Sequence, residues 1–435
     1  MLATVDDLHG LVDAVAQLPL AESESNATQR IAALEELKAA CAAAQARETA
    51  RIDELRRRDE ECRNVPRRKQ GRGLASEIGL ARKASPRKGA QYLGFARALV
   101  HEMPHTLAAL TSGVLTEWRA TLVVRETAHL SRETRTEIDR RICADPAALV
   151  GVGDREIEAM AKRHAYELDP AAVVARTGKA AQDRRVTVRP APDVMSQISA
   201  LLPVAQGVAV YAALKRHADS TVGADDRTHA QIIADTLVER VTGQASASAV
   251  PVAVEVVMSE QTLLGGTDGA ELPGFGPIPG HVARELIADG IDADDEVVSS
   301  LRRLYARPAD GSLVSMDSRS RCFPAGLARF IARRDRRCRM AYCDGAIAEI
   351  DHAYPHRHGG ATSADNGDGT CRDHNRAKEA DGWQFRVGTI DGRHRIDVTT
   401  PTGEIHHCTA PPAVGYQPDT VSVVETELRA WLNAA

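Results

Sequence analysis

Two pairs of metal-binding residue types near the C-terminus constrain this chain more than any other feature. Four residues separate Cys338 from Cys343, two separate Cys371 from His374, and about 28 positions separate the two pairs. Soft ligands in two closely spaced pairs are typical of a closed tetrahedral zinc site, in which the metal joins two tight turns. The sequence therefore predicts a structural Zn²⁺ ion held by these four side chains.

The composition is that of a folded globular protein rather than a disordered chain. Of the 435 residues, 43% are hydrophobic and 26% are charged, so the chain can bury a sizeable core. At roughly 150 residues per domain, this length corresponds to two to four domains. Aromatic residues make up only 3% of the chain, which argues against an aromatic-rich β-sandwich.

Features of the N-terminus and of the apolar segments favour a cytoplasmic location and no membrane partner. The first 25 residues contain acids but no Lys or Arg, whereas a secretory signal has a basic start. The most apolar stretch, residues 198–214, is too short to span a bilayer. Five of the eight cysteines are scattered along the chain, which does not fit a secreted disulfide framework.

Hydrophobic periodicity predicts a mainly α N-terminal region with a small α/β centre. We expect a long helix that is capped by Asn26 and ends near Arg63. Alternating residues predict strands at 185–189 and 250–258, with helices around 195–214 and 229–241 between them. A Gly-rich loop over 265–280 and a helix near 281–288 follow. The predicted divisions are a helical segment (1–65), a helical and α+β region (66–300), an Arg-rich connector (301–337), a metal-binding domain with a closing hairpin (338–415) and a C-terminal helix or tail (416–435).

Two features of residues 51–88 leave alternatives open. Thirteen Lys or Arg residues lie here against six acids, which is typical either of a solvated helix face or of contact with phosphate groups. The segment from Gly73 to Leu80 and the helix start at Ser85-Pro86 also have the outline of a helix-turn-helix. The turn is longer than usual, so plain helix packing is preferred over DNA reading.

Some polar residues outside the zinc pairs also have two interpretations. Arg125, Glu126 and Asp235 can form a polar centre in the helical region, but an ordinary ion pair is preferred. His356 and His358 can reach a site near the zinc pairs, although exposed loop residues are the preferred interpretation.

The residues between the zinc pairs carry a second set of chemical groups. Asp351 and His352 end a predicted strand, and Asn375 lies one turn into a predicted helix that starts at the second pair. A ββα-metal unit of this kind lets Asp351 and Asn375 meet at the strand–helix seam and hold a hard divalent cation through oxygen. Because strand residues alternate, His352 points away from Asp351 and its imidazole can take a proton from water. A base and a Lewis acid are the parts that hydrolysis of a phosphodiester needs.

These residues closely resemble the HNH endonucleases, specifically their zinc-containing branch. The resemblance covers about 45 residues with fixed spacings and implies that His352 is the general base and that Asn366 positions its loop. It also implies that Asp351 and Asn375 bind the catalytic Mg²⁺ or Mn²⁺ ion. The matching positions are Cys338, Cys343, Asp351, His352, Pro355, Gly359, Gly360, Asn366, Cys371, His374, Asn375 and Lys378.

Two positions depart from the family pattern. Asn375 stands where many members carry His, but an amide oxygen is still a hard ligand for a divalent ion. Gly367 and Gly369 stand where the family prefers Leu after the Asn, which predicts a looser loop.

Most of residues 70–415 is also similar to the 13E12 repeat family of actinobacteria, whose members carry a helical region ahead of an HNH domain. The similarity rests on short stretches along the chain, and it assigns no chemistry to the helical region. The stretches are Leu110–Gly113, Trp118-Arg119, Arg125–Thr127, Asp169-Pro170, Arg184–Thr187, Ala234–Leu237 and the closing Thr400–Gly403 hairpin.

The charge is unevenly distributed and predicts a DNA-facing end. The whole chain has a formal charge of −5, whereas residues 301–386 hold 16 Lys or Arg against 11 acids. Positive side chains beside a nuclease fold are typical of contacts to the phosphate backbone, which position DNA without reading its sequence. The residues predicted to bind DNA are Arg333, Arg334, Arg336, Arg337, Arg339 and Lys378.

The sequence thus predicts a divalent-metal-dependent endonuclease that hydrolyses DNA, with a helical N-terminal region and a C-terminal zinc-containing ββα-metal (HNH) domain. One alternative is a zinc-containing DNA-binding module that has lost cleavage. Another is an interaction scaffold in which zinc is only structural. The sequence does not predict an oligomeric state.

Overall fold

The computed structural model describes residues 4–223, 226–244, 255–292, 317–318 and 322–414. The chain divides into two compact units. We call residues 1–71 and 90–177 the helical unit, and residues 72–89 and 178–435 the second unit. The predicted helix or tail over 416–435 lies outside the described residues, as does most of the predicted strand over 250–258.

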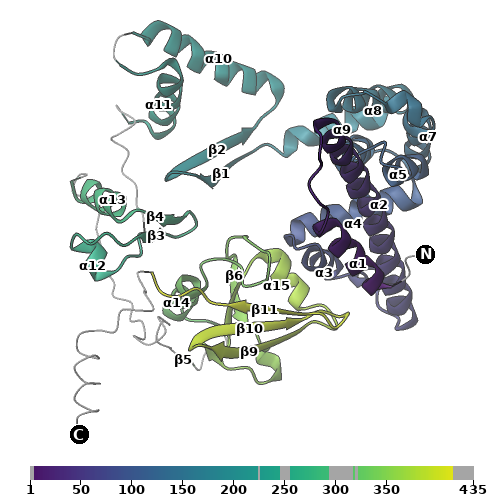
Figure 1. Cartoon of the computed structure of the whole chain (residues 1–435). Helices are drawn as coiled ribbons and strands as arrows, with labels where there is room; N and C mark the ends of the chain where they lie inside the picture. Colours follow the sequence, from purple (N-terminus) through teal and green to yellow (C-terminus); the bar gives the residue numbers. More distant parts are fainter. Residues whose placement is uncertain (1–3, 224–225, 245–254, 293–316, 319–321, 415–435) are drawn as a thin grey trace. The chain divides into compact units, whose positions relative to one another are not determined.

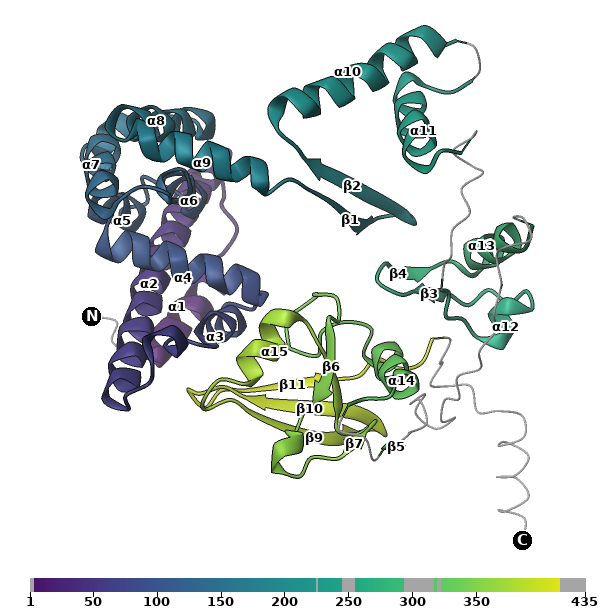
Figure 2. The same cartoon turned by 180° about the vertical axis from the view of Figure 1, so that it is seen from behind.

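The helical unit is built around one long helix with an alanine-rich face. α2 begins after Ser23, whose hydroxyl accepts a hydrogen bond from the Asn26 backbone N–H, so the cap lies three residues before the predicted one. Ala39, Ala43 and Ala46 recur at helical spacing and are buried, which lets α5 and α6 pack closely against α2 (Figures 1 and 2). The elements are α1 Val5–Ala16, α2 Glu24–Cys62, η1 Arg67–Lys69, α4 Pro86–His101, α5 Pro104–Thr111, α6 Glu117–Thr127, α7 Arg132–Cys143, η2 Pro146–Leu149, α8 Asp154–Leu168 and α9 Pro170–Gln182.

The first part of the second unit combines small hairpins with helices. β1 pairs with β2 in antiparallel register, so the helix predicted from Met195 is wrong over residues 195–201. Asp193 and Val194, with φ of 58° and 61°, turn the chain back on itself, and this turn overrides the helical pattern. The elements are β1 Arg185–Ala191, β2 Met195–Leu201, α10 Val204–Thr221, α11 His229–Thr242, α12 Glu260–Leu263, β3 Ala270–Leu272, β4 Gly276–Ile278 and α13 Gly280–Asp292.

The rest of the second unit, which we call the C-terminal region, holds the residues of interest. A two-stranded ribbon of β6 and β8 lies between α14 and α15, and a sheet of order β11-β10-β9 completes the region. The elements are β5 Asp317–Ser318, α14 Ala325–Asp335, β6 Glu349–His352, η4 His356–His358, β7 Thr362–Ser363, β8 Gly367–Thr370, α15 Arg372–Lys378, β9 Gln384–Ile390, β10 Arg393–Thr399 and β11 Ile405–Thr409.

The C-terminal region includes two segments that the sequence pattern had assigned to other parts of the chain. α14 packs on β8 through Leu327 and Ile331, so the predicted boundary at 338 falls inside this structure. α3, Leu74–Ala81, contacts α15 and buries Leu80 in the same apolar cluster as Trp383. Its Glu77 carboxylate accepts hydrogen bonds from the backbone N–H and the hydroxyl of Thr402. The first helix of the helix-turn-helix outline therefore packs within a domain, as the preferred interpretation expects.

Candidate functional site

The four predicted zinc ligands lie together in the structure. The ligand atoms of Cys338, Cys343, Cys371 and His374 are all within 4.8 Å of one another. His374 Nδ1 lies 3.3 Å from the sulfur of Cys338 and 3.5 Å from that of Cys371, and the sulfurs of Cys343 and Cys371 are 3.9 Å apart. In a tetrahedral site with zinc–sulfur bonds of about 2.3 Å, the sulfur atoms lie at separations close to the 3.9 Å between Cys343 and Cys371. The geometry can bind a metal ion such as zinc.

Two backbone features bring the ligand pairs together. Tyr342 adopts a positive φ of 58°, which closes the turn between Cys338 and Cys343, and the Cys338 N–H donates to the carbonyl of Gly345. A side chain at Gly345 would lie 3.2 Å from Cys371 Cβ and 3.3 Å from Cys343 Sγ, so this position favours glycine. Cys371 is the N-cap of α15, which places His374 in the first turn of that helix. Gly345 was not recognised from the sequence.

The thiols of this cluster influence one another strongly. The hydrogen bond with Cys343 and the neighbouring Cys371 raise the pKa of Cys338, and burial adds to this effect. The hydrogen bonds with Cys338 and Cys343 lower the pKa of Cys371. Thiols so close together cannot all ionise unless a cation lies among them, and a bound metal supplies that charge.

His352 lines a hollow of about 840 Å³, together with Asp351. Its Nε2 is 2.8 Å from the hydroxyl of Thr362, and its ring lies 4.6 Å from that of Phe323 and 5.3 Å from that of His356. Burial lowers the pKa of His352, partly opposed by the charge of Asp351. The imidazole is therefore neutral at pH 7, which is the form that a general base needs. Thr362 was not singled out from the sequence.

Asp351 lies beside His352 and is held by Lys378. Its Oδ1 is 3.6 Å from His352 Nδ1 and both side chains line the same hollow, so the prediction from strand alternation that they face opposite sides is wrong. The Lys378 ammonium lies 2.8 Å from Asp351 Oδ2 and donates to the His352 carbonyl at 2.9 Å. Burial raises the pKa of Asp351, but the charge and hydrogen bond of Lys378 outweigh it, so the pKa lies below its usual range. Asp351 is a carboxylate at neutral pH and can act as an oxygen ligand.

Asn375 reaches the same strand from α15. Its side-chain N–H donates to the carboxylate of Glu349, two residues before Asp351 on β6. Its Oδ1 is buried and accepts no hydrogen bond from the described residues. This amide oxygen is thus available to a cation, whereas Glu349, which anchors the amide, was not recognised from the sequence.

Asn366 fixes the loop that follows His352. Its Oδ1 accepts from the Tyr354 N–H at 2.8 Å, and its Nδ2 donates to the carbonyls of Tyr354 and Ala361 at 3.0 and 2.9 Å. A side chain at Gly360 would lie 2.0 Å from the Tyr354 oxygen, so only glycine allows this close approach. These contacts match the role in positioning the loop that the resemblance implies.

Gly367 and Gly369 tighten the structure instead of loosening it, contrary to the expectation from the sequence. A Cβ at Gly367 would lie 2.2 Å from Ile331 Cδ1, and one at Gly369 would lie 2.7 Å from Ile347 Cδ1. The glycines thus allow α14 to pack directly on β8, and β8 is buried along its whole length. The sequence pattern gave no sign of this contact, because it depends on a helix assigned to the connector.

A buried ionic cluster stabilises the junction of α14 with β8. The guanidinium of Arg334 binds Asp335 and the carbonyls of Ala364 and Gly367, while Asp335 accepts a hydrogen bond from the Gly369 N–H at 2.9 Å. Arg339 lies 3.5 Å from Asp335 and donates to the Cys408 carbonyl. Both arginines are almost fully buried.

The residues predicted to bind DNA therefore occupy very different environments. Arg334, Arg339 and Lys378 are buried and bonded to groups within the domain, so they cannot reach a phosphate without breaking these contacts. Arg336 is half-buried and donates to the Pro412 carbonyl, and Arg333 pairs with Glu255. Arg337 is exposed and pairs with the exposed Asp344. Other exposed cations beside the site are Arg357, Arg372 and Arg376.

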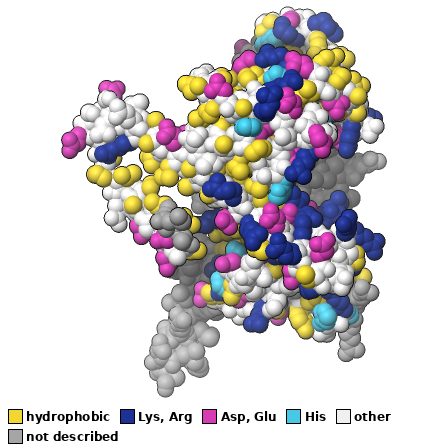
Figure 3. Space-filling view, turned by 90° about the vertical axis from the view of Figure 1, so that its right-hand side faces the viewer, with side chains coloured by type: hydrophobic (Ala, Val, Ile, Leu, Met, Phe, Trp, Pro, Cys, Tyr) yellow, Lys and Arg dark blue, Asp and Glu magenta, His cyan; other side chains and the backbone are white. Residues whose placement is uncertain are grey.

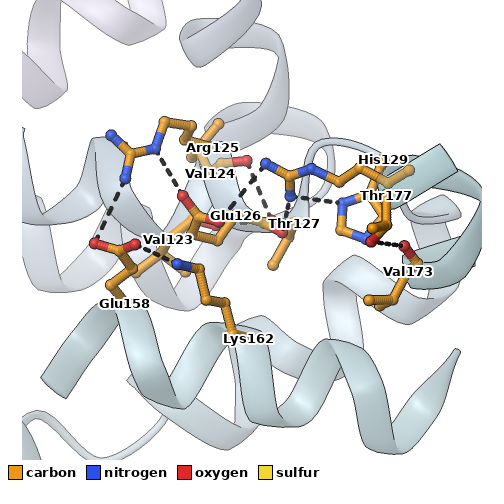
Figure 4. A network of polar contacts seen from close by, with 11 residues as sticks. Val123, Val124, Arg125, Glu126, Thr127, His129, Glu158, Lys162, Val173 and Thr177 are labelled. Carbon is orange, nitrogen blue, oxygen red and sulfur yellow. Dashed lines mark hydrogen bonds and ion pairs between the residues drawn. The ribbon is translucent and has the colours of Figure 1, made fainter. Parts of the chain in front are cut away.

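The polar centre considered in the helical region is a set of ion pairs. Arg125 bonds to Glu126 at 2.7 Å, and Arg176 from α9 binds the Glu126 carbonyl and the His129 ring (Figure 4). Asp235 is not part of it and pairs with Arg227 in the second unit. The preferred ion-pair interpretation holds for these residues.

A family model matches residues 31–335 and carries the description "Domain of unknown function (DUF222)". The chain belongs to the DUF222 family. The match ends three residues before Cys338, so the zinc-type cluster and the residues around His352 follow the matched region. No curated protein and no solved structure matches the chain. Among the described residues of this DUF222 protein, no helix is long and apolar enough to cross a membrane.

Proposed function

We propose that this protein is a divalent-metal-dependent HNH endonuclease that hydrolyses phosphodiester bonds of DNA. The observation that carries the proposal is that a carboxylate and a neutral imidazole share one hollow. Asp351 and His352 both line it, and Asp351 Oδ1 lies 3.6 Å from His352 Nδ1. DUF222 regions are commonly found with C-terminal HNH domains in actinobacteria, which supports the assignment and the 13E12 type.

His352 would act as the general base. Its imidazole takes a proton from a water molecule in the hollow, and the hydroxyl of Thr362 and the ring of Phe323 keep it oriented. Asn366 keeps the following loop closed, so that His356 and Arg357 line the same hollow. Arg357 is exposed and pairs with Glu379 at 2.8 Å, so it must leave this ion pair to offer its charge to the phosphate.

The residues fit a hard divalent ion such as Mg²⁺. Asp351 offers a carboxylate, and the buried Asn375 Oδ1 has no partner among the described residues. Oxygen ligands from one or two protein groups, completed by water and phosphate, suit this ion. When bound, the ion stabilises the charge that develops on the departing 3′-oxygen. The Cys₃His cluster would hold Zn²⁺ as a purely structural ion.

A plasmid-nicking assay tests this function. Cleavage should require Mg²⁺ or Mn²⁺, leave 5′-phosphate and 3′-hydroxyl ends, and fall by at least tenfold in Asp351→Asn. Asp373→Asn is the matched control, because it removes an exposed acid from the same region. Metal-independent cleavage, or equal rates for the two variants, would contradict the proposal.

A second candidate is a zinc-stabilised DNA-binding module without cleavage. The Lys378 ammonium favours it, because it already neutralises Asp351 in the position where a metal ion would bind. A protein that retards DNA but shows no cleavage with any divalent metal would have this function.

A further inference from the structure

A turn at the end of α2 presents exposed cations without ionic partners. Arg58, Arg67, Arg68 and Lys69 are exposed, and their side chains make no ion pair with the described acids. We call these four residues the basic turn. Residues 56–69 hold seven Lys or Arg against three acids. Of those acids, Asp59 pairs with Arg63 and Glu60 is buried.

This arrangement differs from the rest of the helical unit. Most other cations of that unit are neutralised by a nearby acid, as in the pairs Arg119–Asp154, Arg140–Glu137 and Arg163–Glu156. On the face drawn in Figure 3, dark blue cations commonly lie beside magenta acids. The C-terminus of a helix offers only about half a negative charge. Four unpaired cations are therefore more than the end of α2 can balance.

The basic turn is also held in a fixed shape. The Glu60 carboxylate accepts a hydrogen bond from the Gly71 N–H at 2.7 Å, and the Gln70 amide donates to the Val65 carbonyl at 3.0 Å. The Val65 N–H bonds to the Glu60 carbonyl at 2.8 Å. The cations thus project from a closed turn, so little conformational entropy is lost when they meet a ligand.

We propose that the basic turn binds the phosphate backbone of duplex DNA, as a contact surface separate from the cleavage site. Clustered cations gain affinity by releasing counterions from a polyanion, which neutral or singly charged ligands cannot match. A membrane surface is less suitable, because Pro66 and Val65 are the only apolar residues within 65–70 and interfacial binding needs an apolar face. The preference for DNA over RNA rests on the proposed function.

The test is fluorescence anisotropy with a short labelled DNA duplex in buffer without added Mg²⁺ or Mn²⁺, so that binding is measured without cleavage and the structural zinc is kept. The variant is Arg67→Gln/Arg68→Gln/Lys69→Gln, which leaves the Glu60 and Gly71 anchors intact. The control is Arg140→Gln/Arg163→Gln, which removes exposed cations that are already paired. Melting temperatures of the three proteins establish that each is folded.

We expect the variant to bind the duplex about tenfold more weakly at moderate salt, while the control binds like wild type. The slope of log affinity against log salt should fall by about 2 to 3, since each lost phosphate contact removes about 0.9. An unchanged slope and affinity would overturn the proposal. So would a loss seen only with phosphatidylserine vesicles or only with duplex RNA. Because the assay contains no added Mg²⁺ or Mn²⁺, failure of cleavage leaves this result intact.

Discussion

The helical unit and the C-terminal region reach stability by different routes. The helical unit buries one continuous apolar cluster that extends from α2 to α8. The C-terminal region has two smaller clusters, together with a buried Arg–Asp network and the Cys₃His group, whose cysteines belong to one of the clusters. A large apolar core needs no metal, whereas a small one commonly does. The comparison therefore predicts that a chelator or a charge substitution will unfold one region and spare the other.

Loss of a metal ligand should lower the stability of the C-terminal region more than any other change. In Cys371→Ala, the C-terminal region should lose its cooperative unfolding transition, since structural zinc contributes about 10–16 kcal/mol of apparent binding energy in small domains. The helical unit should keep its amide-exchange protection. Cys322→Ala, which removes an exposed thiol, is the control. A metal-free protein with both regions protected would contradict this comparison.

Neutralising Asp335 should cause the next largest loss of stability, again in the C-terminal region. In Asp335→Asn, the guanidinium groups of Arg334 and Arg339 stay buried without their counterion, so we expect a loss of about 3–5 kcal/mol from the C-terminal region. Urea unfolding followed at Trp383, which lies in that region, measures it. Asp344→Asn, at an exposed pair, should change stability by less than about 1 kcal/mol. Equal effects would show that the network is not stabilising.

Truncating a buried apolar side chain of the helical unit should lower the stability of that unit alone. Leu99 is fully buried in the helical unit, and Leu99→Ala should lower the stability of that unit by about 2–4 kcal/mol. Exposed Leu8→Ala serves as the control. Amide exchange resolved by region should show faster opening of α2 and α5 and unchanged opening of β6 and β8. Loss of protection in both places would mean that the units do not unfold separately.

The smallest effect expected is a shift in the pH profile. Because burial holds the pKa of His352 below 6.5, the proposed cleavage should rise with pH through a pKa below that value as the base loses its proton. The charge of His356 also lowers this pKa, so His356→Ala should move the acid limb of the profile to higher pH. Initial rates from pH 5 to 8 measure the limb. A limb above 7 in wild type would contradict the assignment of His352.

Local sequence patterns predicted part of the chemistry of the C-terminal region. Ligand spacing predicted the Cys₃His cluster, whereas strand alternation wrongly placed Asp351 and His352 on opposite sides. The Cys₃His cluster is local, so a few residues determine it. The long helix and β1 followed from periodicity for the same reason.

Contacts between segments far apart in the chain could not be predicted from local sequence patterns. The arginines predicted to bind DNA looked alike in the sequence, yet Arg334 and Arg339 are buried because α14 packs on β8, and Arg337 is exposed. The packing of Gly367 against Ile331 depends on the same contact. Likewise, Met195–Leu201 forms a strand because β1 is available as a partner, which outweighs its helical pattern.

The most direct test of the account is the rate of Mg²⁺-dependent plasmid cleavage by His352→Ala. The buried imidazole is the proposed base, so its removal should slow cleavage by about 10²–10⁴-fold. His358→Ala, which removes an exposed imidazole from the same loop, should cleave at nearly the wild-type rate. Equal rates for His352→Ala and wild type, with zinc retained and DNA still bound, would contradict the proposed nuclease.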